Sequence, residues 1–170
     1  MLKNAIEHPP MRGTVRPLRA QDREALRTLL IATEMFTEAE VSIALELIDI
    51  VLGSGEQRDY IINVAEEEGN VLGYYCIGPT PATQGTFDLY WIAVTPGEHG
   101  RGIGTALTAH AENLVRSLGG RLLIAETSSQ PRYEKTRRFY LRLGFDEVAR
   151  IPGYYRPDDD LVVYGKYFRS

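Results

Sequence analysis

The sequence predicts an α/β domain, an α+β mixed sheet whose faces are covered by helices. Two apolar patterns alternate along the chain. Short runs of β-branched and aromatic residues are typical of strands, and longer stretches with apolar residues three and four positions apart are typical of helices. Their order is β-α-α-β-β-β-α-β-α-β-β. With 170 residues, 44% of them hydrophobic, the chain can form one domain with a full core. We expect this domain over residues 13–170, after a flexible arm over residues 1–12.

The first half of the chain contains one strand, two helices and a hairpin. The second helix begins with the capping-box pattern Thr37-x-x-Glu40, and Gly53-Ser54-Gly55 marks its end. The hairpin turn is expected at Glu67-Glu68-Gly69-Asn70, because these residue types favour tight turns. In chain order the elements cover residues 14–18, 22–32, 37–53, 60–65 and 71–77.

The second half alternates strands with helices and ends with two strands. One strand is rich in aromatic and β-branched residues, and the helix after it has one apolar stripe that stops at Gly119-Gly120. The strands are expected over residues 87–94, 122–127, 145–151 and 161–168, and the helices over residues 102–118 and 131–143. The segment 151–160 separates the last two strands.

A glycine-rich junction joins the strand that ends at Val94 to the next helix. Its glycines let backbone N–H groups turn inward, and the free N–H groups and positive dipole of the first helical turn favour an anion such as pyrophosphate. A Walker-type loop is excluded, because Ile103 rather than Lys follows Gly102. A dinucleotide fingerprint fits poorly, because its third glycine would fall at Thr105.

This junction resembles motif A of the GNAT superfamily of N-acetyltransferases, Val-x-Pro-x-x-Arg/Gln-Gly-x-Gly-x-Gly/Ala, which binds the pyrophosphate of acetyl-CoA. His99 stands where the family usually has Arg or Gln, and Arg101 is expected to offset the charge. The match covers Val94, Pro96, Gly100, Gly102, Ile103 and Gly104. The resemblance implies that acetyl-CoA is bound by Ile92, Val94, His99, Gly100, Arg101, Gly102, Gly104 and Thr105, with a backbone N–H of Ile92 or Val94 facing the thioester oxygen.

A second motif, Phe139-Tyr140-x-x-x-Gly144-Phe145, resembles the end of a helix in the same family. Gly144 followed by an apolar residue is typical of a helix C-terminus. The resemblance implies that Tyr140 contacts coenzyme A and protonates its leaving thiolate; the alternative is a core tyrosine with its hydroxyl at the rim. Tyr133 stands where many relatives have Asn, so its contact with the cofactor is expected to differ.

Acetyl transfer to an amine also needs a base that removes a proton from the alkyl ammonium group. Asp88 lies on the strand that ends at Val94, where some relatives carry a catalytic Glu, and we predict that it is the base, directly or through water. Glu126, at the end of the strand over residues 122–127, is the rival base. The alternative for Asp88 is a carboxylate in solvent or paired with an Arg.

The acceptor site is expected to draw on two segments. Tyr154 and Tyr155 precede three aspartates, a combination that could hold a cation, although a solvated turn is the alternative. Glu34, Met35 and Phe36, between the first two helices, would form the other wall in a GNAT fold. A polyamine, an amino acid, an aminoglycoside-like drug and a protein amine remain open as acceptors.

Composition excludes several other classes of function. A net charge of −4 without a basic stripe argues against nucleic acid. Apolar runs are far shorter than the ~20 residues of a membrane span, and the N-terminus lacks the apolar stretch of a signal peptide. The single cysteine, Cys76, fits a reducing cytoplasm and inert packing rather than an acyl-enzyme. His99 and His110 have no companions at metal-ligand spacing, so no metal is expected.

The predicted function is therefore a cytoplasmic N-acetyltransferase that moves an acetyl group from acetyl-CoA to a primary amine in a ternary complex. The alternative is a non-catalytic module that binds or senses acyl-CoA. Tyr140 and Asp88 favour the enzyme, since binding alone needs neither side chain. Whether the protein is a monomer or a homodimer is left open.

Overall fold

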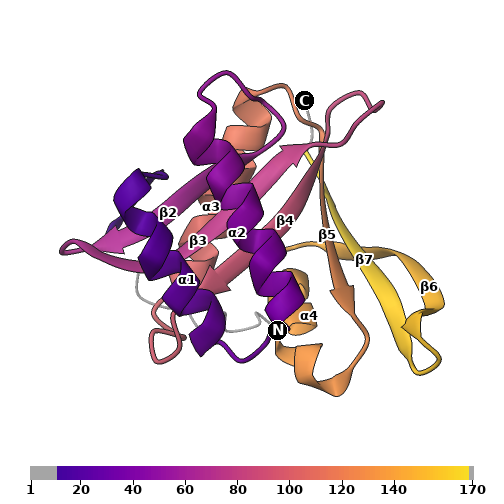
Figure 1. The fold of residues 1–170 in the computed structure, drawn as a ribbon. Coiled ribbons are helices and arrows are strands. Elements are labelled where there is room, and N and C mark those ends of the chain that lie inside the picture. Colours follow the sequence, from indigo (N-terminus) through magenta and orange to yellow (C-terminus); the bar gives the residue numbers. More distant parts are fainter. Residues whose placement is uncertain (1–10, 169–170) are drawn as a thin grey trace, which may run out of the picture. The chain divides into compact units, whose positions relative to one another are not determined.

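A computed structural model describes residues 11–168, so the expected arm over residues 1–12 lies almost wholly outside the described residues. The described elements follow the predicted order (Figure 1). The strands are β1 (Thr14–Pro17), β2 (Ile61–Glu67), β3 (Asn70–Pro79), β4 (Thr86–Val94), β5 (Leu122–Ser128), β6 (Asp146–Arg156) and β7 (Asp159–Tyr167). The α-helices are α1 (Arg23–Ala32), α2 (Glu38–Gly53), α3 (Ile103–Ser117) and α4 (Glu134–Arg142).

The strands form one seven-stranded sheet in the order β1-β2-β3-β4-β5-β7-β6. β4 and β5 are parallel, whereas the pairs β1–β2, β5–β7 and β6–β7 are antiparallel, so the predicted mixed sheet is confirmed. The chain forms two compact units. The first contains the residues up to Cys76 and Trp91–His110, and the second contains Ile77–Tyr90 and the residues from Ala111 onward. One domain over residues 13–170 stays a prediction.

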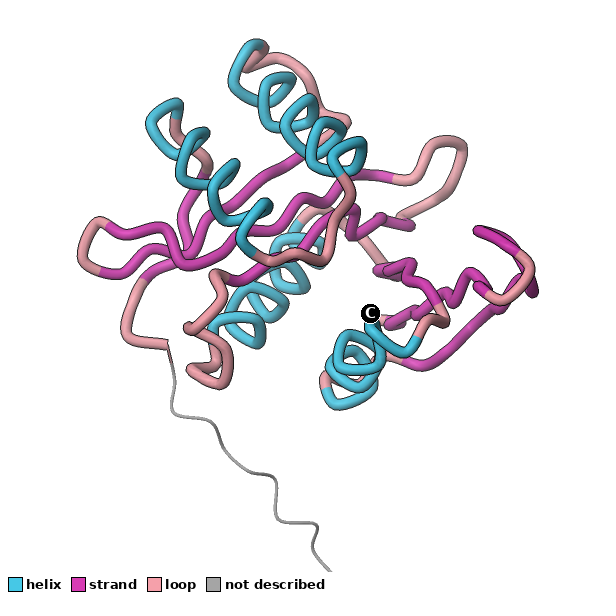
Figure 2. Tube along the Cα trace, turned by 60° about the horizontal axis from the view of Figure 1, so that its bottom comes forward, coloured by secondary structure: helices cyan, strands magenta, loops and turns pink. Residues whose placement is uncertain are grey.

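In the first unit, α1 and α2 lie on one side of the strands and α3 lies on the other (Figure 2). The apolar stripes of α1 and α2 pack on Val64, Tyr74 and Cys76. On the other side Gly73 lets α3 approach closely, because a Cβ there would be 3.1 Å from Leu107 Cδ1. The capping box is confirmed: the Glu40 N–H donates to Thr37 Oγ1, and Glu40 accepts from the Thr37 N–H.

In the second unit, α4 and the end of α3 cover one face of β7. The Tyr140 ring of α4 lies 5.4 Å from Phe145 and 5.6 Å from Tyr164, measured between ring centroids. Lys166 of β7 donates to Glu112 of α3 and to the Leu143 carbonyl at the end of α4. These contacts fix α4, which carries the second sequence motif.

Most boundaries shift by one or two residues from the sequence prediction, and two segments differ in kind. The segment 151–160 is largely strand, because β6 continues to Arg156 and β7 begins at Asp159. Gly153, with φ +63°, and a register shift between Ile151 and Arg156 carry β6 past Pro152. The predicted helix over residues 131–143 starts as a separate 3₁₀ turn, Pro131–Tyr133, before α4. Among the described residues, no helix has both the length and the apolar character needed to cross a membrane.

Candidate functional site

The glycine-rich loop between β4 and α3 has the backbone conformation that an anion site needs. Gly97, Gly100 and Gly102 have φ values of +88°, +83° and +75°, a region that residues with a Cβ rarely enter. Around Gly97 and Gly100 the space is open, since an added Cβ would meet no atom within 4 Å. Two predicted pyrophosphate contacts, Gly100 and Gly102, are therefore left-handed glycines, and the space around Gly100 is open.

The start of α3 supplies free donors beside this loop. The Ala106 N–H donates to the Gly102 carbonyl at 2.9 Å, which is the first turn of helical hydrogen bonding. The N–H groups of Ile103, Gly104 and Thr105 precede it and have no helical acceptor. Together with the helix dipole they can bind a phosphate without any basic side chain.

Arg101 already forms ion pairs within the protein. Its guanidinium forms ion pairs with Glu98, in the same loop, and with Glu67 at the end of β2. These carboxylates raise the pKa of Arg101 above its ordinary value, the hydrogen bonds to Glu98 and Glu67 being the largest causes. His99 is exposed. Because two carboxylates neutralise Arg101, the loop offers an anion mainly its backbone N–H groups.

Two carboxylates meet on adjacent parallel strands in the second unit. The β4–β5 ladder joins Thr86–Leu89 to Leu122–Ala125 and pairs Asp88 with Ile124. Glu126 is two positions beyond Ile124, so its side chain points to the same face as that of Asp88. It is also the first residue of β5 beyond this ladder. Both predicted bases are therefore brought together.

The environment of Glu126, including Asp88, changes the pKa of its carboxyl group. Burial raises the pKa of Glu126 above its ordinary value, and the negative charge of Asp88 raises it further. Glu126 is nevertheless an exposed residue. Its neighbours therefore shield only part of the side chain from water. A carboxylate with a raised pKa is a stronger base, which suits proton removal from an amine.

Asp88 is held by a hydroxyl group rather than by a cation. Thr80 Oγ1 donates to Asp88 Oδ2 at 2.7 Å. Within the described part of the chain, Asp88 has no ion pair with Arg or Lys. Sequence reasoning missed Thr80, because the register of the β3–β4 hairpin decides which side chain faces Asp88.

Tyrosines of β6 lie close to the carboxylate pair. Burial raises the pKa of Tyr155 to about 12, and Glu126 is the next largest cause, followed by Tyr154, Asp159 and Tyr133. The rings of Tyr154 and Tyr155 meet edge to face, with centroids 5.0 Å apart. Both remain largely exposed. The arrangement combines negative charge with aromatic rings, which suits an alkyl ammonium group.

Two of the three aspartates after Tyr155 are bonded within the fold. Asp159 Oδ1 accepts from Ser128 Oγ, and Asp160 Oδ1 accepts from the Gly153 N–H at 2.9 Å. Asp160 also pairs with Arg150. These side chains stabilise the β6–β7 hairpin, so Asp88 and Glu126 are the carboxylates better suited to hold a cation.

Tyr140, the predicted acid, is almost fully buried. It is 4% exposed and packs among Phe139, Phe145 and Tyr164. Burial raises the pKa of its hydroxyl above the ordinary value near 10, so the group keeps its proton at neutral pH. Tyr133 lies in the 3₁₀ turn before α4, with the Arg132 guanidinium 4.9 Å from its ring centroid.

The predicted acceptor wall lies in the connection between α1 and α2. Glu34 is exposed and has φ +53°, which is unusual for a residue with a Cβ. Phe36 packs on Trp91 of β4, with ring centroids 5.5 Å apart. The Trp91 indole N–H is buried and has no hydrogen-bond partner among the described residues. Sequence reasoning missed Trp91, which reads as a core residue of its strand.

Other groups considered for chemistry are structural. Burial raises the pKa of the Cys76 thiol to about 12, which keeps it in the unreactive protonated form. His110 Nδ1 lies 2.8 Å from the Tyr75 hydroxyl, which also accepts from Asn63. Over residues 11–168, no three His, Cys, Asp or Glu side chains gather in a way that could hold a metal ion.

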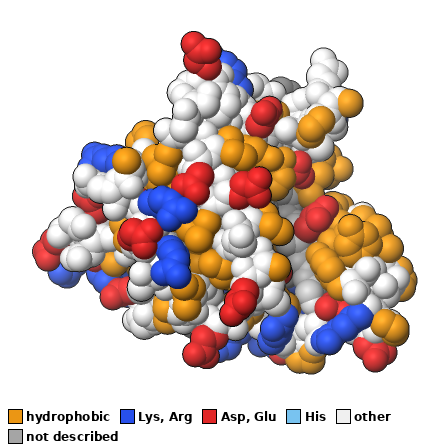
Figure 3. Space-filling view, viewed as in Figure 1, with side chains coloured by type: hydrophobic (Ala, Val, Ile, Leu, Met, Phe, Trp, Pro, Cys, Tyr) orange, Lys and Arg blue, Asp and Glu red, His pale blue; other side chains and the backbone are white. Residues whose placement is uncertain are grey.

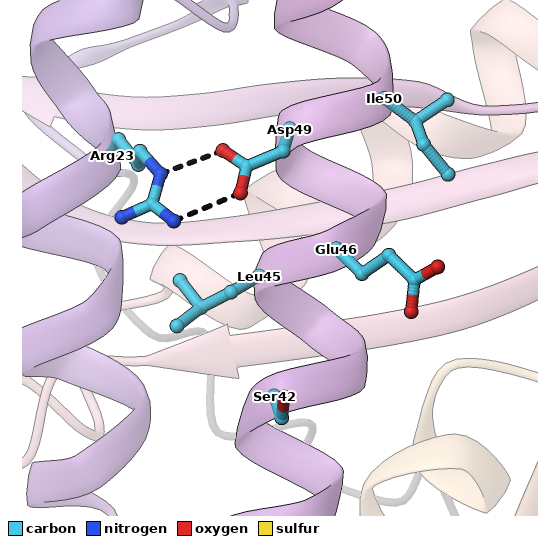
Figure 4. A pocket seen from close by; sticks show the side chains of 6 residues that line it. All are labelled: Arg23, Ser42, Leu45, Glu46, Asp49 and Ile50. Carbon is cyan, nitrogen blue, oxygen red and sulfur yellow. Dashed lines mark hydrogen bonds and ion pairs between the residues drawn. The ribbon is translucent and has the colours of Figure 1, made fainter.

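A shallow hollow of about 530 Å³ lies on the outer side of α1 and α2 (Figure 4). The Arg23–Asp49 ion pair spans the two helices there, and Leu45, Glu46, Ser42 and Ile50 complete the lining. Acidic and basic side chains are interspersed on this face (Figure 3). None of the predicted site residues lines the hollow, so it is separate from the proposed chemistry.

Comparison with known proteins identifies a family and a similar fold. The sequence pattern of the acetyltransferase (GNAT) family matches residues 24–145, more than half of the chain. A crystal structure from Desulfovibrio desulfuricans, assigned as an acetyltransferase of the GNAT family, is 43% identical with a TM-score of 0.88. That alignment covers 91% of this chain and 98% of the other.

Two further comparisons concern ligands. A curated relative, 5-NmdU N-acetyltransferase from Pseudomonas phage PaMx11, is 38% identical over 92 residues. The match covers 54% of this chain and 61% of that protein, so the chain spans less than two thirds of the relative's length. The structure of yncA from Salmonella typhimurium, determined with its cofactor acetyl-CoA, is 21% identical with a TM-score of 0.72 over 94% of this chain and 95% of that one. At that identity the likeness concerns the fold alone.

Proposed function

The chain belongs to the acetyltransferase (GNAT) family, and from this premise we propose that it transfers an acetyl group from acetyl-CoA directly to a primary amine. The observation that carries the proposal is the left-handed glycine loop at the start of α3, which lies within the matched residues 24–145. A cytoplasmic location and the oligomeric state stay predictions.

Acetyl-CoA is the donor substrate, and the loop suits its pyrophosphate. Gly100 and Gly102 turn the backbone, and the free N–H groups at the start of α3 supply the donors. Arg101 contributes little charge while Glu67 and Glu98 hold it. His99 and Thr105 are exposed beside the loop and complete the contacts. The thioester oxygen accepts from a backbone N–H of Ile92 or Val94.

The carboxylate pair deprotonates and binds the acceptor. Glu126 removes the proton from the ammonium group, which the raised pKa of its carboxyl group supports. Asp88 holds the ammonium group, which the hydrogen bond from Thr80 to Asp88 Oδ2 supports, because that bond leaves Oδ1 available. The sequence prediction gave the base role to Asp88 and named Glu126 as its rival, and the geometry favours a division of labour between the two.

The transfer itself is balanced by two proton movements. The free amine attacks the thioester carbon, the carbon–sulfur bond breaks, and the electrons of that bond leave with sulfur. The thiolate takes a proton from the Tyr140 hydroxyl, which burial keeps protonated. The ammonium nitrogen loses two protons on becoming an amide. The first passes to Glu126 before attack, and the second leaves as the carbon–sulfur bond breaks and replaces, through solvent, the proton that Tyr140 gave to the thiolate. No covalent acyl-enzyme is needed, and the buried, protonated Cys76 is unsuited to form one.

The acceptor is a primary amine that arrives as a cation. Asp88 and Glu126, which have no basic partner among residues 11–168, lie near Tyr155 and favour an alkyl ammonium over an anionic substrate. Glu34 and Phe36, in the connection between α1 and α2, stay predicted acceptor contacts. The name of the phage relative makes the amine of 5-NmdU one specific candidate among small and protein amines.

The test is release of free thiol from acetyl-CoA with a panel of amines. The panel contains n-butylamine, spermidine, lysine, kanamycin, a peptide with a free N-terminus and 5-NmdU. We expect thiol release above the rate of hydrolysis for at least one amine, with an equal amount of N-acetylated product by mass spectrometry. Coenzyme A binding without product for every amine would favour the non-catalytic acyl-CoA-binding module.

A further inference from the structure

We propose that Thr80 is a positioning residue that orients the Asp88 carboxylate toward the ammonium group of the acceptor. The proposal rests on the proposed function, because it assumes that Asp88 holds the acceptor. Thr80 follows the last residue of β3, and Asp88 lies on β4, so the two face each other across the hairpin.

The backbone of Thr80 is fixed on both sides. Its N–H donates to the Thr86 carbonyl at 2.9 Å, and its carbonyl accepts from Thr83 Oγ1 at 2.7 Å. Threonine is also stiff about its first side-chain torsion, because its Cβ is branched. The Thr80 hydroxyl is therefore held in one place, and it donates a hydrogen bond to Asp88 Oδ2 at 2.7 Å.

This bond fixes one oxygen of Asp88 and leaves the other available. A carboxylate that accepts a single hydrogen bond still has lone pairs on both oxygens, so Oδ1 can accept from an ammonium group. Without Thr80 the carboxylate could rotate about its terminal torsion, which has a broad energy minimum. Repulsion from Glu126, on the same face, would favour such a rotation.

A neutral donor suits this task better than a cation. An arginine or lysine at the position of Thr80 would neutralise Asp88 and compete with the acceptor amine for the same carboxylate. The Thr80 hydroxyl orients the carboxylate without placing a competing cation beside it. Asp88 has no ion pair within the described residues, which agrees with this assignment.

The test compares Thr80→Val with Thr80→Ser in the full chain, with n-butylamine as the acceptor because ammonium is its only polar group. Valine keeps the shape and removes the donor. We expect Thr80→Val to raise KM for n-butylamine about tenfold, with KM for acetyl-CoA unchanged, since hydrogen bonds to charged groups are of that strength. Serine keeps the donor and should stay within about threefold of the natural protein.

Two controls separate positioning from folding. Thr28→Val removes an exposed hydroxyl that donates to the Glu24 carbonyl in α1, and it should leave both KM values unchanged. Combining Thr80→Val with Asp88→Asn should add no further loss, because Thr80 acts only through Asp88. Thermal unfolding checks that each variant is folded.

Each outcome decides a different claim. If Asp88→Asn leaves turnover of n-butylamine unchanged, the role of Asp88 in the proposed function is wrong. If Asp88→Asn impairs turnover but Thr80→Val does not, Asp88 keeps its role and the proposal for Thr80 is overturned. Equal losses in Thr80→Val and Thr80→Ser, or a matching rise in KM for acetyl-CoA, would also overturn it.

Discussion

Asp88 and Glu126 point to the same face of two parallel strands, and the charge of Asp88 raises the pKa of Glu126. Neither residue forms an ion pair within the described residues, although Arg and Lys neutralise most other carboxylates of the second unit. Two uncompensated carboxylates side by side are unfavourable unless something cationic binds there. We therefore propose that the ammonium group of a substrate binds at this pair.

The pH dependence of turnover distinguishes the two possible bases. If Glu126 is the base, kcat/KM rises with pH through the raised pKa of Glu126, and Asp88→Asn should move that limb to lower pH, because one cause of the raised pKa is gone. Glu126→Gln should lower kcat/KM by ~10²-fold or more at low pH, with a smaller loss at high pH, where free amine is abundant. If Asp88→Asn instead shows that low-pH loss and Glu126→Gln does not, Asp88 is the base.

The glycine loop predicts a selective loss of cofactor affinity. Gly102 has φ +75°, so Gly102→Val should cost about 1–2 kcal/mol of unfolding free energy and should also crowd the phosphate. Gly97→Val is the matched control, because Gly97 has φ +88° but lies outside the predicted phosphate contacts. We expect calorimetry to show a loss of coenzyme A affinity in Gly102→Val only. Equal affinity in both folded variants would remove the loop from the cofactor site.

The sequence predicted most of the fold because its signals are local. The helix boundaries of α2 follow from the Thr37–Glu40 capping box, and the stripes of α1 and α3 follow from spacing in the chain. The end of β6 could not be predicted in this way. Pro152 and Gly153 favour a turn locally, yet pairing with β7 and a register shift hold the strand to Arg156.

The sequence also could not predict which residues contact the site residues, because these contacts depend on how the strands are aligned in the sheet. The same face for Asp88 and Glu126 requires the pairing of Asp88 with Ile124, and the bond from Thr80 requires the β3–β4 hairpin. Likewise, Glu67 at the end of β2 forms an ion pair with Arg101, which lies in the loop between β4 and α3. A single sequence names the chemical groups at the site, whereas long-range pairing decides which of them meet.

The ion pairs of Arg101 predict that removing one of its carboxylate partners increases coenzyme A affinity. Glu98→Gln should release part of the Arg101 charge to the phosphate and raise coenzyme A affinity several-fold at low salt, with the gain reduced by added salt. Arg101→Ala in the natural background should change coenzyme A affinity little, because its charge is already neutralised. Glu134→Gln, which removes an exposed partner of Arg138 on α4, is the control. A large loss in Arg101→Ala would mean that Arg101 leaves its carboxylates to bind the cofactor.

Burial of Tyr140 leads to the last prediction. Tyr140→Phe keeps the ring contacts with Phe145 and Tyr164 and removes only the hydroxyl, so the free energy of unfolding should change little. If the hydroxyl protonates the thiolate, kcat should fall by ~10²-fold while coenzyme A affinity is retained. Burial raises the pKa of Tyr140 above its ordinary value near 10. If loss of the Tyr140 proton lowers kcat at alkaline pH, that fall should therefore begin above pH 10. Tyr164→Phe, in the same aromatic cluster, is the matched control and should retain turnover. If both variants turn over n-butylamine at the natural rate, Tyr140 serves packing alone and the thiolate leaves unprotonated or takes its proton from water.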